Sequence, residues 1–342
     1  MEKIIRIGTR ESQLAVWQAE QVKSLLAQHG FASELVYIKS EGDIDLKTPL
    51  YEMGVQGIFT KSLDIALLND KIDIAVHSMK DVPTQLAKGI VQASVLKRSS
   101  YKDILVLRPG LSDLKTYFSW ESVSITATGS KNIVKESRWS LPLSEHPDRP
   151  GEMEDIVIAT SSVRRIAQWL NKYPGHKIEN LRGNVNTRLF KLKESNWHGA
   201  IFAAAGLERI NLRPQNSVEL DWMLPAPAQG AIMVVCREDD QFSLEACNNF
   251  NDDDTALCTK IERDFLKTLL GGCSTPISAL AEVKRKYVYF RGNILSLDGK
   301  EKAEIGYTVD KKQVDGLGKI AAKKILTEGG KEIVEKIRNA AK

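Results

Sequence analysis

The chain has 342 residues, of which 42% are hydrophobic and 27% are charged, and its formal net charge is +4. This composition is typical of a folded globular protein and excludes disordered and fibrous classes, while the small net charge gives no indication of nucleic-acid binding. The length exceeds the roughly 250–300 residues at which one hydrophobic core stops growing, so we expect two or three domains.

The sequence shows no pattern of a targeting or membrane segment. The N-terminus enters a strand-like run at Ile4 without an apolar signal core, and no stretch approaches the ~18 apolar residues of a membrane span. The cysteines, Cys236, Cys247, Cys258 and Cys273, are too widely spaced for a C-x-x-C motif. We therefore expect a cytoplasmic protein with no membrane partner and no metal site.

Short apolar runs alternate with helical patterns through most of the chain. The runs predicted to be buried strands are Ile4–Ile7, Leu35–Ile38, Ile72–Val76, Ile104–Leu107, Ile156–Ala159, Ala200–Ala204 and Ala231–Val235. The clearest helix begins after Ser12, a possible N-cap, and ends at Gly30. This alternation is typical of βα units around parallel-rich sheets, so we expect an α/β fold.

Residues from about 112 to 152 interrupt the alternation. They contain Trp120, Trp139, several prolines and serines, and little hydrophobic periodicity. This composition is typical of an insertion on a domain surface. Two interpretations stay open: a surface elaboration without a role in function, and a flap that shapes a ligand cleft.

The C-terminal part of the chain has a different pattern. A helix is predicted to start at Thr255 and to end at Gly271 and Gly272. The predicted strands Tyr287–Phe290, Ile294–Leu297 and Ala303–Val309 follow, separated by Arg291-Gly292-Asn293 and Asp298-Gly299-Lys300, which have the composition of turns. With two further helices at the end, this indicates a small α+β domain.

Four polar clusters follow predicted strands, where open α/β sheets form their ligand crevices. They are Gly8–Ser12, His77–Pro83, Thr160–Arg165 and Leu181–Arg188. The nucleotide-binding patterns G-x-G-x-x-G and G-x-x-x-x-G-K-[ST] do not occur. Helix starts, hydroxyls and guanidinium groups favour a ligand that carries carboxylates or phosphates.

The charged residues of these clusters have a functional and a purely structural interpretation. Lys80 supplies a positive charge, and the adjacent Asp81 can accept a proton or stabilise a cationic nitrogen of a substrate. The alternatives are ordinary capped helices, a surface Lys-Asp pair, and arginines on a solvated face. Aromatic residues do not interleave with the arginines, which favours a small polyanion over nucleic acid.

Cys273 differs from the other cysteines in its surroundings. It lies in Leu269–Pro276, a turn shaped by Gly271 and Gly272, so its sulfur can project into a cleft. The other cysteines lie in strand-like or helix-like segments, where inert thiols are the common case. We predict that Cys273 is the reactive cysteine.

Taken together and in this order, these clusters resemble the porphobilinogen deaminase family, also called hydroxymethylbilane synthases, of tetrapyrrole biosynthesis. The resemblance covers nearly the whole chain through Gly8–Arg10, His77–Pro83, Thr160–Arg165, Leu181–Val185, Leu224–Ala231 and Gly271–Cys273. It implies two α/β lobes like those of periplasmic binding proteins and a small C-terminal α+β domain. We expect residues 1–97 with 218–238 to form the first lobe, 98–217 the second, and 239–342 the third domain.

The resemblance also implies the reaction and the roles of individual residues. In this family a cysteine holds a dipyrromethane cofactor through a thioether, four porphobilinogen molecules are added head to tail with loss of ammonia, and hydrolysis releases the tetrapyrrole. Carried over by motif, Cys273 is the attachment site, and Asp81 with Lys80 forms the catalytic pair. The expected cofactor ligands are Ser12, Lys80, Asp81, Thr160, Ser161, Ser162, Arg164, Arg165 and Arg188. The expected substrate ligands are Arg10, Ser12, Lys61, Arg164, Arg182 and Arg188.

Two features depart from the family pattern. Gln56 stands where the family often has lysine, which leaves Lys61 as the nearby cation, and the insertion at about 112–152 exceeds the short linker of bacterial members. We expect a monomer that binds porphobilinogen and no nucleic acid. The competing hypothesis is a non-catalytic, two-lobed binding protein for a small polycarboxylate, which would need no placed thiol.

Overall fold

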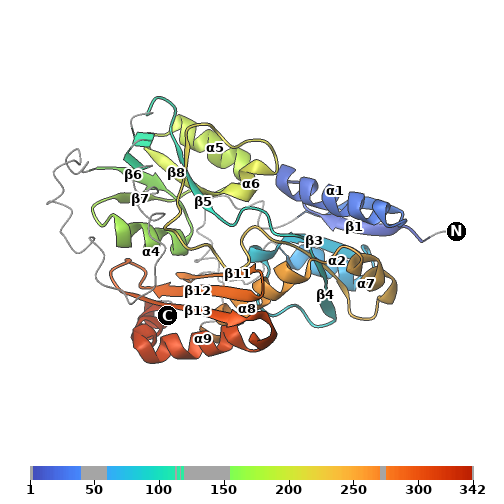
Figure 1. The fold of residues 1–342 in the computed structure, drawn as a ribbon. Coiled ribbons are helices and arrows are strands. Elements are labelled where there is room, and N and C mark those ends of the chain that lie inside the picture. The colour runs from blue at the N-terminus through green and yellow to red at the C-terminus, as the bar shows by residue number, and fades with distance from the viewer. Residues whose placement is uncertain are drawn as a thin grey trace.

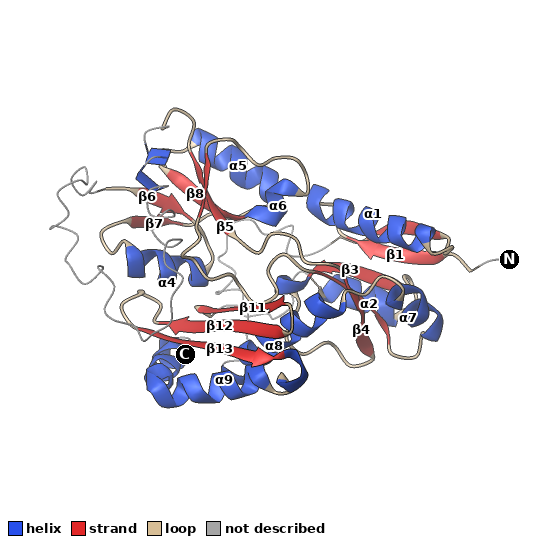
Figure 2. Ribbon diagram, viewed as in Figure 1, coloured by secondary structure: helices blue, strands red, loops and turns tan. Residues whose placement is uncertain are grey.

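Residues 3–39, 60–111, 114–115, 117–118, 155–269 and 275–340 are described by the computed structural model. Within these ranges the chain forms three β-sheets with helices packed against them (Figures 1 and 2). None of the helices in these ranges is both long enough and apolar enough to cross a membrane.

The first lobe is a mixed sheet covered by helices on both faces. Its strands lie in the order β2 (Ser33–Tyr37), β1 (Ile5–Thr9), β3 (Ile74–Ser78), β10 (Ile232–Arg237) and β4 (Ile90–Val95). The first three are parallel, and β10 runs antiparallel to both of its neighbours. Helices α1 (Gln13–Gln28) and α7 (Gln241–Asn248) cover one face, and α2 (Lys61–Leu68) covers the other.

Alternation along a strand explains this layering. Ile74 and Val76 of β3 pack with α1, whereas Ala75 packs with α2. Successive side chains of a strand point to opposite faces, so a sheet buried on both sides requires a continuous apolar run. The run predicted at Ile72–Val76 is therefore confirmed as a central strand, although the strand itself spans Ile74–Ser78.

The second lobe repeats the strand arrangement of the first. Its order is β7 (Lys177–Glu179), β6 (Val157–Ala159), β8 (Gly199–Ala203), β5 (Asp103–Leu107) and β9 (Ser217–Glu219). The first three strands are again parallel, and β5 is antiparallel to both neighbours. Its helices are α4 (Val163–Lys172), α5 (Val185–Glu194) and α6 (Ala204–Glu208).

Two chain segments cross between the lobes. One joins β4 to β5 and the other joins β9 to β10, so each lobe receives its antiparallel strand from a crossing. The crossings touch, since the Ser99 amide donates to the Gly230 carbonyl at 3.2 Å. Gly230 has φ +86°, and an added Cβ would come within 2.6 Å of the Ser100 carbonyl oxygen. Glycine is needed there both for its backbone angle and for the close approach.

The third domain packs helices on a three-stranded antiparallel meander. It comprises α8 (Asp253–Leu269), β11 (Ile277–Lys284), β12 (Tyr287–Leu295), β13 (Lys302–Asp310), α9 (Leu317–Ile325) and α10 (Lys331–Ala340). The predicted turn at residues 291–293 is wrong, because these residues lie inside the continuous strand β12. An added Cβ at Gly292 would come within 2.7 Å of the Phe265 ring, so this glycine makes room for an aromatic side chain.

The α/β class, with two lobes and a small C-terminal α+β domain, is confirmed, but two boundaries differ from those expected. β9 pairs with β5, which places residues 218–219 in the second lobe. Ala246 and Cys247 of α7 pack in the core of the first lobe, so the third domain begins at α8 and not at residue 239. Most of the expected insertion lies outside the described residues.

A buried carboxylate of the third domain contacts both crossings. Glu262 of α8 is fully buried and accepts two hydrogen bonds from Arg98, at 2.6 and 3.1 Å. It also accepts from the amides of Ala228 at 2.6 Å and Ala281 at 2.7 Å. Because Arg98 and Ala228 belong to different crossings, Glu262 joins the two inter-lobe connections to the third domain.

Candidate active site between the lobes

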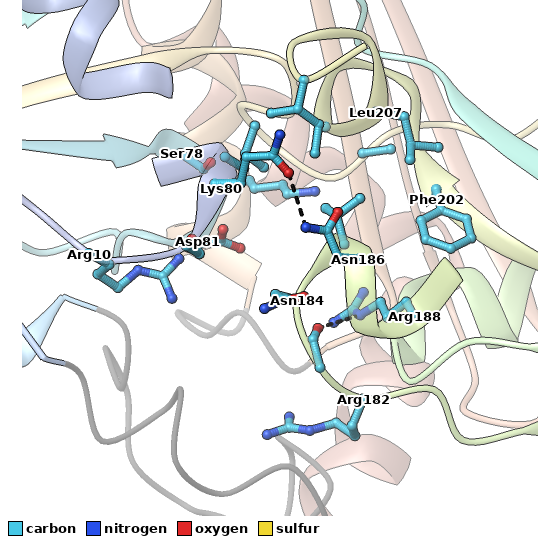
Figure 3. Close-up of a pocket in the computed structure, with 18 of the residues that line it drawn as sticks. Arg10, Ser78, Lys80, Asp81, Arg182, Asn184, Asn186, Arg188, Phe202 and Leu207 are labelled. Carbon is cyan, nitrogen blue, oxygen red and sulfur yellow. Dashed lines mark hydrogen bonds between the residues drawn. The ribbon is translucent and has the colours of Figure 1, made fainter. Parts of the chain in front are cut away.

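A cavity of about 220 Å³ lies between the two lobes (Figure 3). From the first lobe it is lined by Arg10, Ser12, Gln13, Leu14, Ser78, Lys80 and Asp81. From the second lobe it is lined by Arg165, Arg182–Asn186, Arg188, Phe202, Ala203, Gly206, Leu207 and Ile210. Many of these residues follow β1, β3 and β8, so the expectation of a crevice at the strand ends agrees with the position of the cavity.

The first-lobe wall is formed mainly by two short segments, which follow the neighbouring parallel strands β1 and β3. Arg10 and Ser12 lie between β1 and α1, and Ser12 takes the extended backbone of an N-cap, with φ −66° and ψ 140°. Lys80 and Asp81 lie in a single 3-10 turn, Met79–Asp81, directly after β3. Because β1 and β3 are parallel, both segments emerge at the same edge of the sheet.

The second-lobe wall is built around a glycine turn and the start of α5. Gly183 has φ +116°, which an L side chain rarely adopts, and its carbonyl accepts a hydrogen bond from Arg188 Nε at 2.7 Å. Asn184 caps α5 by accepting from the Thr187 amide at 2.9 Å. These contacts hold the short segment 182–188, which contributes Arg182 and Arg188 to the cavity.

The two walls meet through a hydrogen bond and face each other across the cavity. Asn186 Nδ2 donates to Gln13 Oε1 at 3.0 Å, which joins α5 of the second lobe to α1 of the first. In Figure 3, Arg10 and Asp81 lie on the opposite side of the cavity from Arg182 and Arg188. The cavity is thus bounded by charged side chains on both sides.

Positive charge predominates among the residues that line the cavity. The cations are Arg10, Lys80, Arg165, Arg182 and Arg188, and Asp81 is the one acidic residue in the described lining. Burial lowers the pKa of Lys80 to about 8, with Asp81 opposing this shift. Burial, with the nearby charge of Arg165, also lowers the pKa of Arg188 to about 10. Both shifts arise mainly from burial, and an anionic ligand would offset this cost of desolvation.

Arg164 and Arg165 form part of a buried network around Asp103. Arg164 Nη2 and Arg165 Nη2 each lie 2.8 Å from a carboxylate oxygen of Asp103, which is fully buried at the start of β5. Burial alone would raise the pKa of Asp103, but the two guanidinium groups hold it at about 2. Arg165 lines the cavity. Arg164 does not line it, and its guanidinium donates to the Leu224 carbonyl at 2.8 Å.

Gln229 connects this network to the cavity, and it is not among the site residues predicted from the sequence. Its amide nitrogen donates to the Tyr101 carbonyl at 2.8 Å and to Asp103 at 3.0 Å. Its amide oxygen accepts from Lys80 at 3.5 Å. The available signal was a polar residue in the otherwise apolar stretch Ala226–Ala231, where a buried amide needs partners.

The remaining predicted ligands do not line the described cavity. Thr160 is buried, Ser161 donates to the Leu181 carbonyl at 2.9 Å, and Ser162 is the N-cap residue of α4. Lys61 is exposed at the start of α2. Gln56 and Cys273 lie outside the described residues, so their positions stay predictions.

The other cysteines have the surroundings predicted for inert thiols. Cys236, Cys247 and Cys258 are all buried and unpaired in disulfides. Burial raises the pKa of Cys236 and of Cys258 to about 12, which disfavours the reactive thiolate. Among the residues that the structure describes, no group of histidine, cysteine and acidic side chains could hold a metal ion.

The cavity combines two kinds of surface. Leu14, Phe202, Leu207 and Ile210 contribute apolar side chains, and the cations named above contribute charge. An apolar ring can pack on the first surface while its carboxylates pair with the second. A dipyrromethane, which consists of apolar rings bearing acetate and propionate groups, fits this donor set.

Two family models match the chain. Residues 5–245 match "Porphobilinogen deaminase, dipyromethane cofactor binding domain", and residues 256–327 match "Porphobilinogen deaminase, C-terminal domain". A porphobilinogen deaminase of Syntrophomonas wolfei is 36% identical over 96% of this chain and 97% of that protein. A chloroplastic porphobilinogen deaminase of Oryza sativa is 39% identical over 86% of this chain and 75% of that protein.

Solved structures show a weaker similarity. The methionine-binding protein MetQ has a TM-score of 0.40 and 14% identity, over 74% of this chain and 92% of that one. The effector-binding domain of BenM, with benzoate, has a TM-score of 0.38 and 16% identity, over 73% of this chain and 92% of that one. Similarity at this level carries no argument about the site.

Proposed function

The chain belongs to the porphobilinogen deaminase family, and we propose that its reaction takes place in the cavity between the lobes, with Asp81 as the catalytic carboxylate. The enzyme is a transferase, hydroxymethylbilane synthase, with a dipyrromethane cofactor. It joins four porphobilinogen molecules head to tail with loss of ammonia and releases a linear tetrapyrrole.

One observation carries the assignment of the site. Asp81 is the single acidic residue among five cations in the described lining of the cavity. A substrate and a growing product with carboxylates on every ring require cations for binding, and the chemistry requires a group that stabilises positive charge. The cavity supplies cations for binding and one carboxylate for the chemistry, and this excess of cations suits a ligand with several carboxylates.

Asp81 is suited to the charge changes of the reaction. Loss of ammonia leaves an electron-poor methylene carbon and pyrrole nitrogens with partial positive charge, which a fixed carboxylate stabilises. Formation of the new carbon–carbon bond then requires removal of a proton, for which a carboxylate is a suitable base. Lys80, next to it and hydrogen-bonded to Gln229, holds a substrate carboxylate.

The cationic residues hold the carboxylates of cofactor and substrate. We assign Arg10, Ser12, Arg165, Arg182 and Arg188, which line the cavity, to direct binding. Arg164 positions Arg165 through their shared partner Asp103. The roles of Thr160, Ser161, Ser162 and Lys61 stay as predicted from the family pattern. When bound, the cofactor supplies the pyrrole to which the first substrate is joined, and Cys273 is its proposed attachment site.

The test removes the charge of Asp81 without changing its shape. Asp81→Asn is expected to lower kcat by roughly 100-fold or more, the scale of general acid–base and electrostatic contributions. The denatured protein should still carry a mass increment of two linked pyrrole units on the Cys273 peptide if the cofactor was assembled. Wild-type-like turnover by Asp81→Asn would reject the assignment, and an unmodified Cys273 in active enzyme would reject the attachment site.

We further propose that the enzyme is a cytoplasmic monomer that does not bind nucleic acid. The small net charge of +4 supports the last point, since nucleic-acid binding relies on concentrated positive charge. Light scattering on the purified protein tests the monomer, and retention on DNA at moderate salt tests nucleic-acid binding. A non-catalytic binding protein, by contrast, would take up porphobilinogen without releasing ammonia.

A further inference from the structure

An arginine of the third domain contacts the turn that carries Asp81. Arg263 Nη1 donates to the carbonyl oxygens of Met79 at 3.3 Å and Val82 at 2.9 Å, and Nη2 donates to that of Pro83 at 2.5 Å. These carbonyls lie before and after Asp81 in the chain. Arg263 is not among the residues that line the cavity, so it contacts the site through the backbone of this turn.

The turn has few other backbone contacts that would fix it. Within the described residues, the Met79 amide donates to the Ala231 carbonyl at 3.0 Å, and the Val82 amide donates to the Met79 carbonyl at 3.2 Å. A single 3-10 turn is a weak element whose hydrogen bond has poor geometry. A guanidinium offers five N–H donors in a rigid plane, which suits it to hold several carbonyls at once.

The helix that carries Arg263 also contacts the inter-lobe crossings. The preceding residue, Glu262, accepts from Arg98 of one crossing and from the Ala228 amide of the other. In Figure 1, α8 lies between the first lobe and the three-stranded sheet. The helix ends at Leu269, shortly before Cys273 in the chain. One rigid element therefore links the catalytic turn, the crossings and the start of the cysteine segment.

We infer that Arg263 is a positioning residue for the reaction, which sets Asp81 in its catalytic position by holding the carbonyls of Met79, Val82 and Pro83. The inference rests on the proposed role of Asp81. Its physical basis is that a displacement of about 1 Å of a catalytic group can lower a rate by roughly 100-fold. Of the cavity cations, only Lys80 shares this turn, whereas Arg10, Arg165, Arg182 and Arg188 lie on other segments, so substrate binding should change less than turnover.

The experiment replaces Arg263 and, as a matched control, Arg237. Arg237 also donates to two backbone carbonyls, those of Leu67 at 3.0 Å and Ile72 at 2.8 Å, but it lies at the end of the first sheet remote from the cavity. Arg263→Ala is expected to lower kcat by about 10- to 100-fold with KM within about threefold of wild type. Arg237→Ala is expected to lower the melting temperature while kcat stays within about twofold of wild type.

Chemical rescue distinguishes positioning from general destabilisation. Millimolar guanidinium should restore part of the kcat of Arg263→Ala, because it can occupy the vacated site and donate to the same carbonyls. Ammonium, which lacks the planar donor set, should not. Cofactor content, measured as the mass of the denatured protein, is determined in parallel so that kcat refers to loaded enzyme.

The double variant Arg263→Ala/Asp81→Asn separates this inference from the proposed role of Asp81. If Arg263 acts through Asp81, the double variant is no slower than Asp81→Asn. A double variant slower by the full factor of the Arg263 substitution overturns the inference alone. An active Asp81→Asn enzyme overturns the role of Asp81 and with it the inference. A loaded Arg263→Ala enzyme with wild-type kcat, or with raised KM and unchanged kcat, overturns the inference and leaves the role of Asp81 standing.

Discussion

The carboxylate of Glu262 should be one of the most sensitive positions for stability. It is fully buried, and its oxygens accept from both Nη atoms of Arg98 and from the amides of Ala228 and Ala281. Glu262→Gln keeps the shape but removes the charge and replaces one acceptor with a donor. At least one of these donors then faces another N–H group.

The expected magnitude follows from the broken ion pair. Removing one partner of a buried salt bridge costs about 3–5 kcal/mol, because the other charge stays buried without compensation. Arg98 has only 11% of its side chain exposed, so water compensates it little. We expect Glu262→Gln to lower the free energy of unfolding by about 3–5 kcal/mol, a large share of the roughly 5–15 kcal/mol of a typical native protein.

A double substitution separates the ion pair from the backbone contacts. In Arg98→Met/Glu262→Met the pair is gone altogether, which is often nearly neutral for a buried pair. The amides of Ala228 and Ala281 nevertheless lose their acceptor, at about 1–3 kcal/mol each. We therefore expect about 2–6 kcal/mol of destabilisation to remain in the double variant.

Urea unfolding followed by circular dichroism measures these changes, with a surface pair as control. Glu301 and Lys336 form an ion pair with side chains 43% and 61% exposed, and Glu301→Gln should change stability by no more than about 1 kcal/mol. A Glu262→Gln protein as stable as Glu301→Gln would refute the reasoning about burial. A double variant as stable as wild type would refute the reasoning about the amides.

Three further predictions concern the cavity and the crossings. Since burial lowers the pKa of Lys80 to about 8, kcat/KM should fall as pH rises through about 8, and this limb should disappear in Lys80→Arg, whose charge persists; an unchanged limb would contradict the assignment. Arg188→Gln should raise KM by about 10- to 100-fold, from the loss of a charge-assisted hydrogen bond, whereas Lys193→Gln, at an exposed position of the same helix outside the cavity lining, should stay within about twofold in steady-state kinetics. Gly230→Ala should lower the melting temperature more than Gly30→Ala, because both glycines have positive φ but only Gly230 has backbone within 3 Å of the added Cβ; equal losses would show that φ alone matters.

Much of the fold could be predicted from local sequence pattern. Mostly apolar runs such as Ile72–Val76 mark buried central strands, because a strand covered on both faces must be largely apolar on both sides. The turn predicted at residues 291–293 shows where this reasoning fails. The segment 291–293 has the composition of a turn, but Gly292 is needed for its small size, which leaves room for the Phe265 ring. Phe265 is distant from Gly292 in the sequence. Composition alone does not show whether a position requires glycine because of its backbone angle or because a larger side chain would clash with its neighbours.

The site could be predicted where its residues directly follow strands. Arg10, Lys80 and Asp81, which follow β1 and β3, line the cavity, and so do Arg182, shortly before α5, and Arg188, within it. Strand ends are local features, and parallel topology brings them to one edge. Two of their contacts could not be predicted, since Gln229 contacts Lys80 from the crossing and Arg263 contacts the Val82 carbonyl from the third domain, both at long sequence separation.

The arginines of this enzyme divide into two groups that the sequence does not distinguish. Arg98 and Arg164 pair with buried carboxylates and hold the frame, whereas Arg182 and Arg188 belong to the cavity lining, where Asp81 is the only described acid. Arg165 belongs to both groups, because it pairs with Asp103 and also lines the cavity. The difference depends on partners such as Asp103 and Glu262, far away in the chain. A cavity that binds a polycarboxylate needs more cations than acids, and desolvation makes buried cations costly in the absence of ligand. The buried carboxylates therefore have a second effect, because Glu262 and Asp103 offset part of the charge of the arginines that hold the frame, while cations still outnumber acids in the described lining of the cavity.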